Sequence, residues 1–220
     1  MINAEITRLY QLAWRPGAFM HSQWWLSLQL LAWRPYYWAD QAAEGAALME
    51  EPCQAVASAL SFQQLHSPLR QAVDQLICQK RRFPLAPLPA RLSADQQQLL
   101  ALEPRLGKLL VAVGLHLLGS PDYLLRGHYR RVLAPLLGWQ ALDQLWALWR
   151  QGDQPAQLPV EKLVSQAQQC AYQVFNTYLT PDPIWQALTV ILPPPLPASA
   201  PAAVILDNPL TLLFRIARFL

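Results

Sequence analysis

Charged side chains are scarce in this sequence: Lys, Arg, Asp and Glu make up 14% of its 220 residues, against about 25% in an average globular chain. Hydrophobic residues make up 53%, so the chain can bury a substantial core and is not intrinsically disordered. The net charge is only +3. Basic residues gather at 80–82 and at Arg130 and Arg131, without the basic stripe typical of nucleic-acid-binding proteins. We therefore expect no nucleic acid among its partners.

Glycine and cysteine are scarce as well. The 8 glycines form neither GxGxxG nor GxxxxGK[ST], the loops that bind the phosphates of nucleotide cofactors. The 3 cysteines, Cys53, Cys78 and Cys170, lie far apart and form no CxxC pair, which argues against a disulfide framework and a zinc site. Each has apolar neighbours at helical spacing, so we interpret them as small buried hydrophobic residues in a protein of the reducing cytosol.

Residues suited to catalysis do not form a recognisable group. The four histidines, His21, His66, His116 and His128, are isolated from one another, and no HExxH motif occurs. The acids Glu44, Glu50 and Glu51 precede Pro52 and are interpreted as an exposed helix end. His116 lies in an apolar stretch and reads as a core residue. His128 lies beside Arg126, Arg130 and Arg131, which suits an anion or acidic partner and equally a solvated helix face. We predict no catalytic centre, no metal site and no cofactor.

No segment has the composition of a membrane span or a signal peptide. Residues 16–33 contain several polar side chains, and residues 183–206 are interrupted by prolines. A transmembrane helix needs about 20 mostly apolar residues in succession. The first 14 residues contain Glu5 and Arg8 and lack a small-residue cleavage site. We expect a soluble protein.

Apolar residues recur mostly at helical spacing. The clearest stripe comprises Leu69, Ala72, Val73, Leu76 and Ile77, in a helix over 67–82 that Ser67 caps, Pro68 opens and three basic residues end. Further helices are predicted over 93–102, 104–117, 121–138, 139–150 and 160–179, with an extended connector at 83–91. The helix over 104–117 is apolar almost all round, so we expect it at the centre of the core.

The character of the sequence changes after residue 179. Residues 188–192 (LTVIL) favour a short extended segment, residues 193–206 form a proline-rich linker, and a last helix begins near Asn208 and Pro209. That helix either folds back on the domain or serves as a docking tail. The expected fold is mainly α, with a helical domain over 1–192, the linker over 193–206 and the C-terminal helix over 207–220.

Tryptophan is the abundant residue type. Trp24, Trp25, Trp33, Tyr36, Tyr37 and Trp38 crowd into one short region of a chain with 9 tryptophans. Because interfaces favour Trp, Tyr and Arg as anchors, we expect part of this aromatic surface to contact a partner. The predicted partner contacts are Trp24, Trp25, Arg126, Arg130 and Arg131. The alternative, that these tryptophans are core residues and the arginines merely solvated, stays open.

Three stretches resemble one protein family in pattern and order. They are residues 15–21 (RPGAFMH); residues 106–110 (LGKLL), continuing through Gly114 to 132–138; and Trp185 followed by residues 188–193 (LTVILP). Together these cover most of residues 12–197, and the order of features is similar to that of the SctK (YscK-like) accessory proteins of bacterial type III secretion systems. The first dozen residues and the last helix have no counterpart in the resemblance.

The resemblance implies a role without catalysis. Proteins of the SctK family are cytoplasmic components of the sorting platform at the base of the injectisome. They link the cytoplasmic domain of the inner-membrane ring protein (the SctD family) to the pod protein (the SctQ family). The family has no catalytic residues to transfer to this sequence. A non-enzymatic structural adaptor at the cytoplasmic face of the inner membrane is therefore the function that the resemblance favours.

Two alternatives differ in class. A helical enzyme or small-molecule-binding protein, with a site assembled from scattered residues, would present a concave pocket holding His116 or His128 beside an acid. A chaperone for a secreted protein is the third candidate, but such chaperones are more often smaller and acidic.

Overall fold

The computed structural model describes residues 4–34, 61–149, 152–195 and 206–220. Within these ranges the chain forms α-helices and short 3-10 turns and contains no strand, which confirms the mainly α prediction. Contacts divide the chain into two compact units: residues 1–93 with 181–194, and residues 94–180 with 195–220. The first unit is thus built from two separate stretches of sequence. The division into domain, linker and terminal helix stays a prediction, and most of the linker (196–205) lies outside the described residues.

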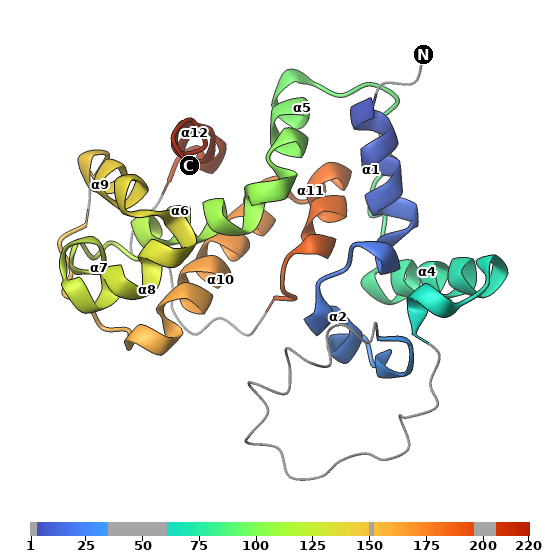
Figure 1. The fold of residues 1–220 in the computed structure, drawn as a ribbon. Coiled ribbons are helices and arrows are strands. Elements are labelled where there is room, and N and C mark those ends of the chain that lie inside the picture. Colours follow the sequence, from blue (N-terminus) through green and yellow to red (C-terminus); the bar gives the residue numbers. More distant parts are fainter. Residues whose placement is uncertain (1–3, 35–60, 150–151, 196–205) are drawn as a thin grey trace, which may run out of the picture. The chain divides into compact units, whose positions relative to one another are not determined.

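The first unit is built from short helices around an aromatic core. It contains α1 (Ala4–Trp14), α2 (Ser22–Ser27), α4 (Ser67–Arg81) and α11 (Pro183–Leu188), with 3-10 turns η1 (Pro16–Ala18), η2 (Leu31–Trp33), η4 (Phe62–Gln64) and η6 (Thr189–Ile191). Helix α1 packs against both α4 and α11 (Figure 1). The Trp25 and Phe62 rings meet with centroids 5.6 Å apart, and Trp185 is fully buried.

Helix α4 confirms the predicted helix but presents a different face to the core. The imidazole of His66, rather than Ser67, caps it and accepts a hydrogen bond from the Leu69 amide at 3.3 Å. Its buried residues are Val73, Asp74, Ile77 and Cys78, whereas Leu69 is exposed. The rotation follows from Asp74, whose carboxylate accepts a hydrogen bond from the Gly17 amide in η1.

The basic residues at the end of α4 have a structural role, as expected from their position at the end of a helix. The Lys80 ammonium donates to the Leu28 carbonyl at 2.6 Å. The Arg81 guanidinium donates to the Gln186 carbonyl at 2.8 Å and to the Thr189 hydroxyl at 2.9 Å. The Lys80 bond attaches α4 to the end of α2. The Arg81 bonds attach α4 to α11 and η6, so they hold residues 181–194 in the first unit. The residues that follow α4, 83–91, form no helix, as predicted.

The extended segment predicted for 188–192 is wrong. Residue 188 ends α11, and Thr189–Ile191 form the 3-10 turn η6, so only Leu192 has extended backbone. The β-branched residues favour a strand locally, but no neighbouring strand is present in the described chain to pair with them. Instead Val190 is buried, and its carbonyl accepts a hydrogen bond from the His21 amide at 2.9 Å. Tertiary packing therefore overrides the local preference.

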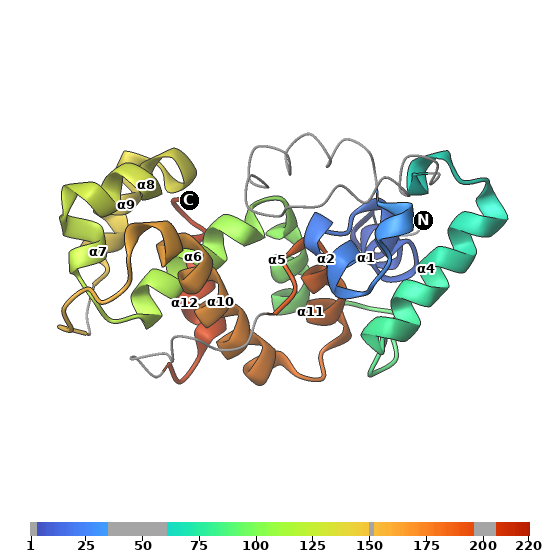
Figure 2. The same ribbon diagram turned by 90° about the horizontal axis from the view of Figure 1, so that it is seen from below.

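The second unit is organised around one buried helix. It contains α5 (Ala94–Ala101), η5 (Glu103–Arg105), α6 (Leu106–Leu117), α7 (Asp122–Leu125), α8 (Gly127–Leu137), α9 (Trp139–Ala147), α10 (Val160–Leu179) and α12 (Pro209–Ile216). Helix α10 lies along α6 in both views (Figures 1 and 2). Nine residues of α6 are buried, which confirms the prediction that this helix is central to the core.

Glycine allows α6 and α10 to approach closely. A Cβ atom added at Gly114 would lie 1.8 Å from the Ala167 carbonyl oxygen and 2.9 Å from its Cα. No side chain can occupy that space, because the obstacle is backbone. The close contact between α6 and α10 therefore depends on a residue without a side chain.

The single helix predicted after Pro121 is two helices. The backbone at Arg126 is extended (φ −77°, ψ 130°) and separates α7 from α8. Gly127, a weak helix former, follows the break. The Arg130 guanidinium then donates to the Leu124 carbonyl at 3.0 Å, which satisfies an acceptor left open at the end of α7.

The last helix folds back on its own unit. The Asn208 side chain caps α12 by accepting a hydrogen bond from the Thr211 amide at 3.2 Å. Leu213 and Ile216 are buried, and α12 packs against α6 and α10. None of the helices in the described residues is both long and apolar enough to cross a membrane.

Candidate interaction surfaces

Two of the predicted partner contacts are core residues. Trp24 and Trp25 in α2 are buried in the first unit. The Trp24 indole donates to the Leu192 carbonyl at 2.9 Å, and the Arg81 guanidinium lies 5.2 Å from its ring centre. Neither side chain offers surface to a partner, because the short helix α2 turns both indoles inward. The predicted aromatic residues 36–38 lie outside the described residues.

The three predicted arginines lie together at the junction of α7 and α8 but differ in their surroundings. Arg126 pairs with Asp122 at 2.9 Å, and Arg130 pairs with Asp143 of α9 at 2.7 Å. Arg131 is exposed and forms no ion pair within the described part of the chain. Arg130 is thus a structural residue that joins α7, α8 and α9, whereas Arg131 is available to a partner.

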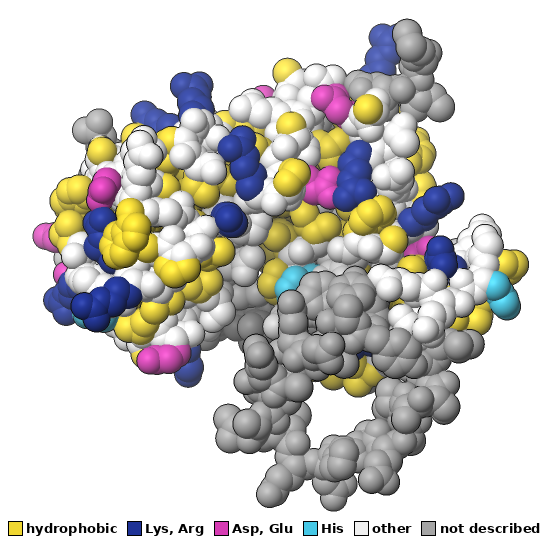
Figure 3. Space-filling view, in the orientation of Figure 1, with side chains coloured by type: hydrophobic (Ala, Val, Ile, Leu, Met, Phe, Trp, Pro, Cys, Tyr) yellow, Lys and Arg dark blue, Asp and Glu magenta, His cyan; other side chains and the backbone are white. Residues whose placement is uncertain are grey.

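Large apolar side chains are exposed beside these arginines. Trp139 is 56% exposed and Trp146 is 42% exposed, and the two lie seven residues apart on one side of α9. The Arg130 guanidinium lies 5.4 Å from the centre of the Trp139 ring. We define the α7–α9 surface by six exposed residues: Leu125, Arg126, Arg131, Val132, Trp139 and Trp146. Figure 3 shows hydrophobic and basic side chains mixed over these three helices.

The sequence contained a signal for this surface. The buried residues of α9 are Ala141, Leu142 and Leu145, which already form a sufficient apolar stripe. Trp139 and Trp146 lie outside that stripe at helical spacing. Two tryptophans on the polar side of an amphipathic helix would have indicated an exposed aromatic surface.

A pocket in the first unit contains a buried carboxyl group. It has a volume of about 460 Å³ between α1, η1 and α4, and it is lined by Gln11, Trp14, Arg15, Ala18, Phe19, Ser67, Arg70, Gln71 and Asp74. Asp74 is 4% exposed, and its Oδ1 accepts a hydrogen bond from the Gly17 amide at 2.9 Å. Burial raises the pKa of this carboxyl group to about 6, although the Gly17 hydrogen bond and the charges of Arg15 and Arg70 act in the opposite direction.

The chemistry of this pocket is limited. Among the described residues that line it, Asp74 is the single acid and none is a histidine. General acid–base catalysis requires a proton donor and acceptor positioned on the same substrate, and this pocket supplies one buried group. Trp14, which is 48% exposed, also lines a neighbouring hollow of about 240 Å³ with Cys78 and Phe83. An exposed indole between two hollows is suited to contact with a protein partner.

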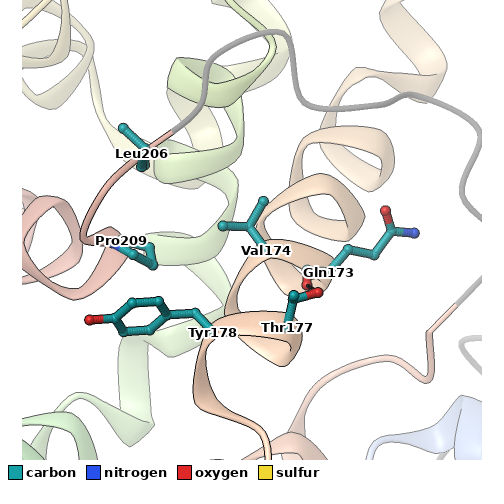
Figure 4. A pocket seen from close by; sticks show the side chains of 6 residues that line it. All are labelled: Gln173, Val174, Thr177, Tyr178, Leu206 and Pro209. Carbon is teal, nitrogen blue, oxygen red and sulfur yellow. Dashed lines mark hydrogen bonds between the residues drawn. The ribbon is translucent and has the colours of Figure 1, made fainter.

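A further pocket lies between α10 and α12. It has a volume of about 560 Å³ and is lined by Gln173, Val174, Thr177, Tyr178, Leu206 and Pro209. Figure 4 shows these side chains around the opening. The described residues that line it include no carboxylate or histidine, so it resembles a packing gap between helices more than a reaction site.

The histidines expected in an enzyme pocket lie elsewhere. His116 contacts the Trp149 ring edge-on with centroids 5.2 Å apart, and burial, followed by the charge of Arg215, lowers its pKa. His128 is exposed and contacts the Tyr129 ring at 4.1 Å. Neither histidine lines the three pockets described above. Within the described residues, no group of three His, Cys, Asp or Glu side chains could hold a metal ion.

Exposed tryptophans such as Trp14, Trp139 and Trp146 are typical of surfaces that contact other proteins. Comparison with known families identifies the assembly: the sequence model of the family described as "Type III secretion system subunit" matches residues 30–194. The chain therefore belongs to this family of type III secretion system subunits, which confirms the prediction of a secretion-system component. Searches of curated proteins and of solved structures found no match.

Proposed function

We propose that this subunit is a non-enzymatic adaptor of the SctK type in the sorting platform of an injectisome. It links the cytoplasmic domain of an SctD-like inner-membrane ring protein to an SctQ-like pod protein, and it acts at the cytoplasmic face of the inner membrane. It needs no cofactor and binds no nucleic acid. The family match over residues 30–194 supports a place in the secretion apparatus, and the adaptor role rests on the distribution of exposed aromatic residues.

That distribution is the observation that carries the proposal. An adaptor needs two surfaces that can be occupied at the same time. The first unit exposes Trp14 between two hollows, and the second unit exposes Trp139 and Trp146. Exposed tryptophans are costly to leave in water, since each can bury roughly 150–250 Å² of surface in a contact. One such surface on each unit supports a chain that binds two partners.

Co-purification of the tagged full-length chain tests this function. The host carries the whole operon, and recovery of the SctD-like and SctQ-like proteins is measured separately. Trp14→Ala should reduce recovery of one partner, and a Trp139→Ala, Trp146→Ala double variant should reduce recovery of the other. Tyr178→Ala serves as the matched control, because this residue is also exposed but belongs to neither surface.

The outcomes separate the possible roles. Loss of one partner at a time, with helical content and melting temperature unchanged, supports the adaptor. Loss of both partners in every variant would indicate one shared surface. If neither partner is recovered with the unmodified chain while both still bind other platform proteins, the adaptor proposal is wrong.

A further inference from the structure

We infer that the α7–α9 surface binds an acidic segment of its partner protein, one whose apolar side chains cover the exposed tryptophans. This inference rests on the proposed adaptor function and names the chemistry of the partner at one of its surfaces. Three features of the second unit favour it: a concentration of exposed apolar side chains, an excess of positive charge, and a helix that begins without an acid.

The first feature is the exposed apolar area. Among the described residues of the second unit, the large exposed hydrophobic side chains are Leu125, Val132, Trp139, Trp146 and Tyr178, and all except Tyr178 lie on α7, α8 or α9. These helices contact one another. A partner that brings apolar side chains to this region would remove them from water together, which is the usual source of affinity at the centre of an interface.

The second feature is the balance of charge. Helices α7, α8 and α9, taken together with Arg126 between α7 and α8, carry three arginines and two aspartates. Each aspartate is paired with an arginine: Asp122 with Arg126 and Asp143 with Arg130. Arg131 is left over, and it is exposed. An approaching carboxylate therefore meets an unmatched positive charge, and the exposed Asp143 repels it little because its charge is offset by Arg130.

The third feature is the start of α8. Acidic side chains are favoured in the first turn of a helix because they complement its dipole. Helix α8 has no acidic residue in its first turn and no side-chain cap; its N-cap residue is Arg126 and His128 follows in the first turn. The chain thus places the Arg126 guanidinium where a negative group is favoured, and a carboxylate from a partner would complement both the helix and the arginines.

Photo-crosslinking in the assembled system tests the inference. The full-length chain, with a benzophenone amino acid in place of Trp146, is expressed with the whole operon and irradiated, and the crosslinked peptide is identified by mass spectrometry. The expected product is a segment of a secretion-apparatus protein in which Asp or Glu alternate with apolar residues. Adding Arg131→Glu should lower the yield about tenfold, as loss of one close charge contact predicts. Arg91→Glu, another exposed arginine, should leave it unchanged.

Each outcome is decisive for the inference. A captured segment without acidic residues, a nuclease-sensitive product, or a yield unchanged by Arg131→Glu overturns it. Absence of a crosslink from the Trp146 position, while both partners still co-purify with the chain, also overturns it but leaves the adaptor function intact. Failure of the unmodified chain to recover either partner refutes the adaptor function itself.

Discussion

Replacing Asp74 by asparagine should stabilise the protein at neutral pH. The carboxyl group is 4% exposed, and its pKa is raised from 3.8 to about 6, chiefly by burial. The folded state therefore binds more protons than the unfolded state between about pH 4 and pH 6. The stability that protonated Asp74 contributes is complete below the unfolded pKa and is lost as the pH rises through the folded pKa.

The magnitude follows from the size of the pKa difference. One pKa unit corresponds to about 1.4 kcal/mol, so a difference of about two units means that ionised Asp74 lowers the free energy of unfolding by about 3 kcal/mol above pH 7. Asparagine is neutral at every pH, and its Oδ1 can still accept the hydrogen bond that the Gly17 amide donates at 2.9 Å. We expect Asp74→Asn to raise the free energy of unfolding at pH 8 by up to about 3 kcal/mol and to have little effect at pH 4.

Urea unfolding between pH 4 and pH 8 measures this difference directly. Asp95→Asn is the matched control, because Asp95 is exposed on α5, and it should reproduce the pH dependence of the unmodified protein. Equal pH dependence of the Asp74→Asn and unmodified proteins would refute the reasoning. So would an NMR titration in which the Asp74 carboxyl group ionises near pH 4, since that would mean that burial does not penalise its charge.

Three other changes test the packing of the second unit. Gly114→Ala should lower the free energy of unfolding by about 3 kcal/mol in denaturant titrations, because the added methyl group meets backbone at 1.8 Å; a change below about 0.5 kcal/mol would contradict the close approach of α6 and α10. Arg130→Glu should lower the free energy of unfolding by about 1–3 kcal/mol, because it breaks the hydrogen bonds to Leu124 and Asp143. Arg131→Glu should change the free energy of unfolding by no more than about 0.5 kcal/mol. Equal effects of the two substitutions would argue against the structural role of Arg130. Burial raises the pKa of the Cys170 thiol to about 11. In a variant with Cys170 as its single cysteine, a disulfide reagent at pH 8 should therefore react only when the protein unfolds. Fast reaction in the folded state would show that the thiol is accessible.

Local sequence signals, either a cap or a long apolar run, predicted the presence of α12 and α6. Asn208 followed by Pro209 marked the start of α12, and the run 104–117 marked the central helix. These features act within a few residues, so they can be read without knowing the rest of the fold. The break at Arg126 was not predicted, because the apolar pattern of residues 121–138 does not require one. The break is accompanied by a hydrogen bond from Arg130 to the carbonyl of Leu124 at the end of α7.

The candidate surfaces were harder to predict, because exposure depends on distant partners. Trp24 is buried, and its indole donates a hydrogen bond to the carbonyl group of Leu192, 168 residues away in the sequence. Asp74 is buried because Gly17, 57 residues earlier, supplies its hydrogen bond. Trp139 and Trp146 could have been assigned to the surface, since α9 has a separate apolar stripe. The three predicted arginines lie together at the start of α8, and their role as partner contacts stays a prediction. The distinction between Arg130 and Arg131 required the position of Asp143.

The discontinuous first unit has a consequence for the order of events during synthesis. Its core includes Trp185, Ile184 and Leu188, which leave the ribosome roughly 90 residues after the end of its first stretch at Ser93. At about 5–20 residues per second, the early helices wait for roughly 5–20 s with their apolar faces uncovered. During that interval the Trp24 indole lacks the Leu192 carbonyl that accepts its hydrogen bond in the finished fold.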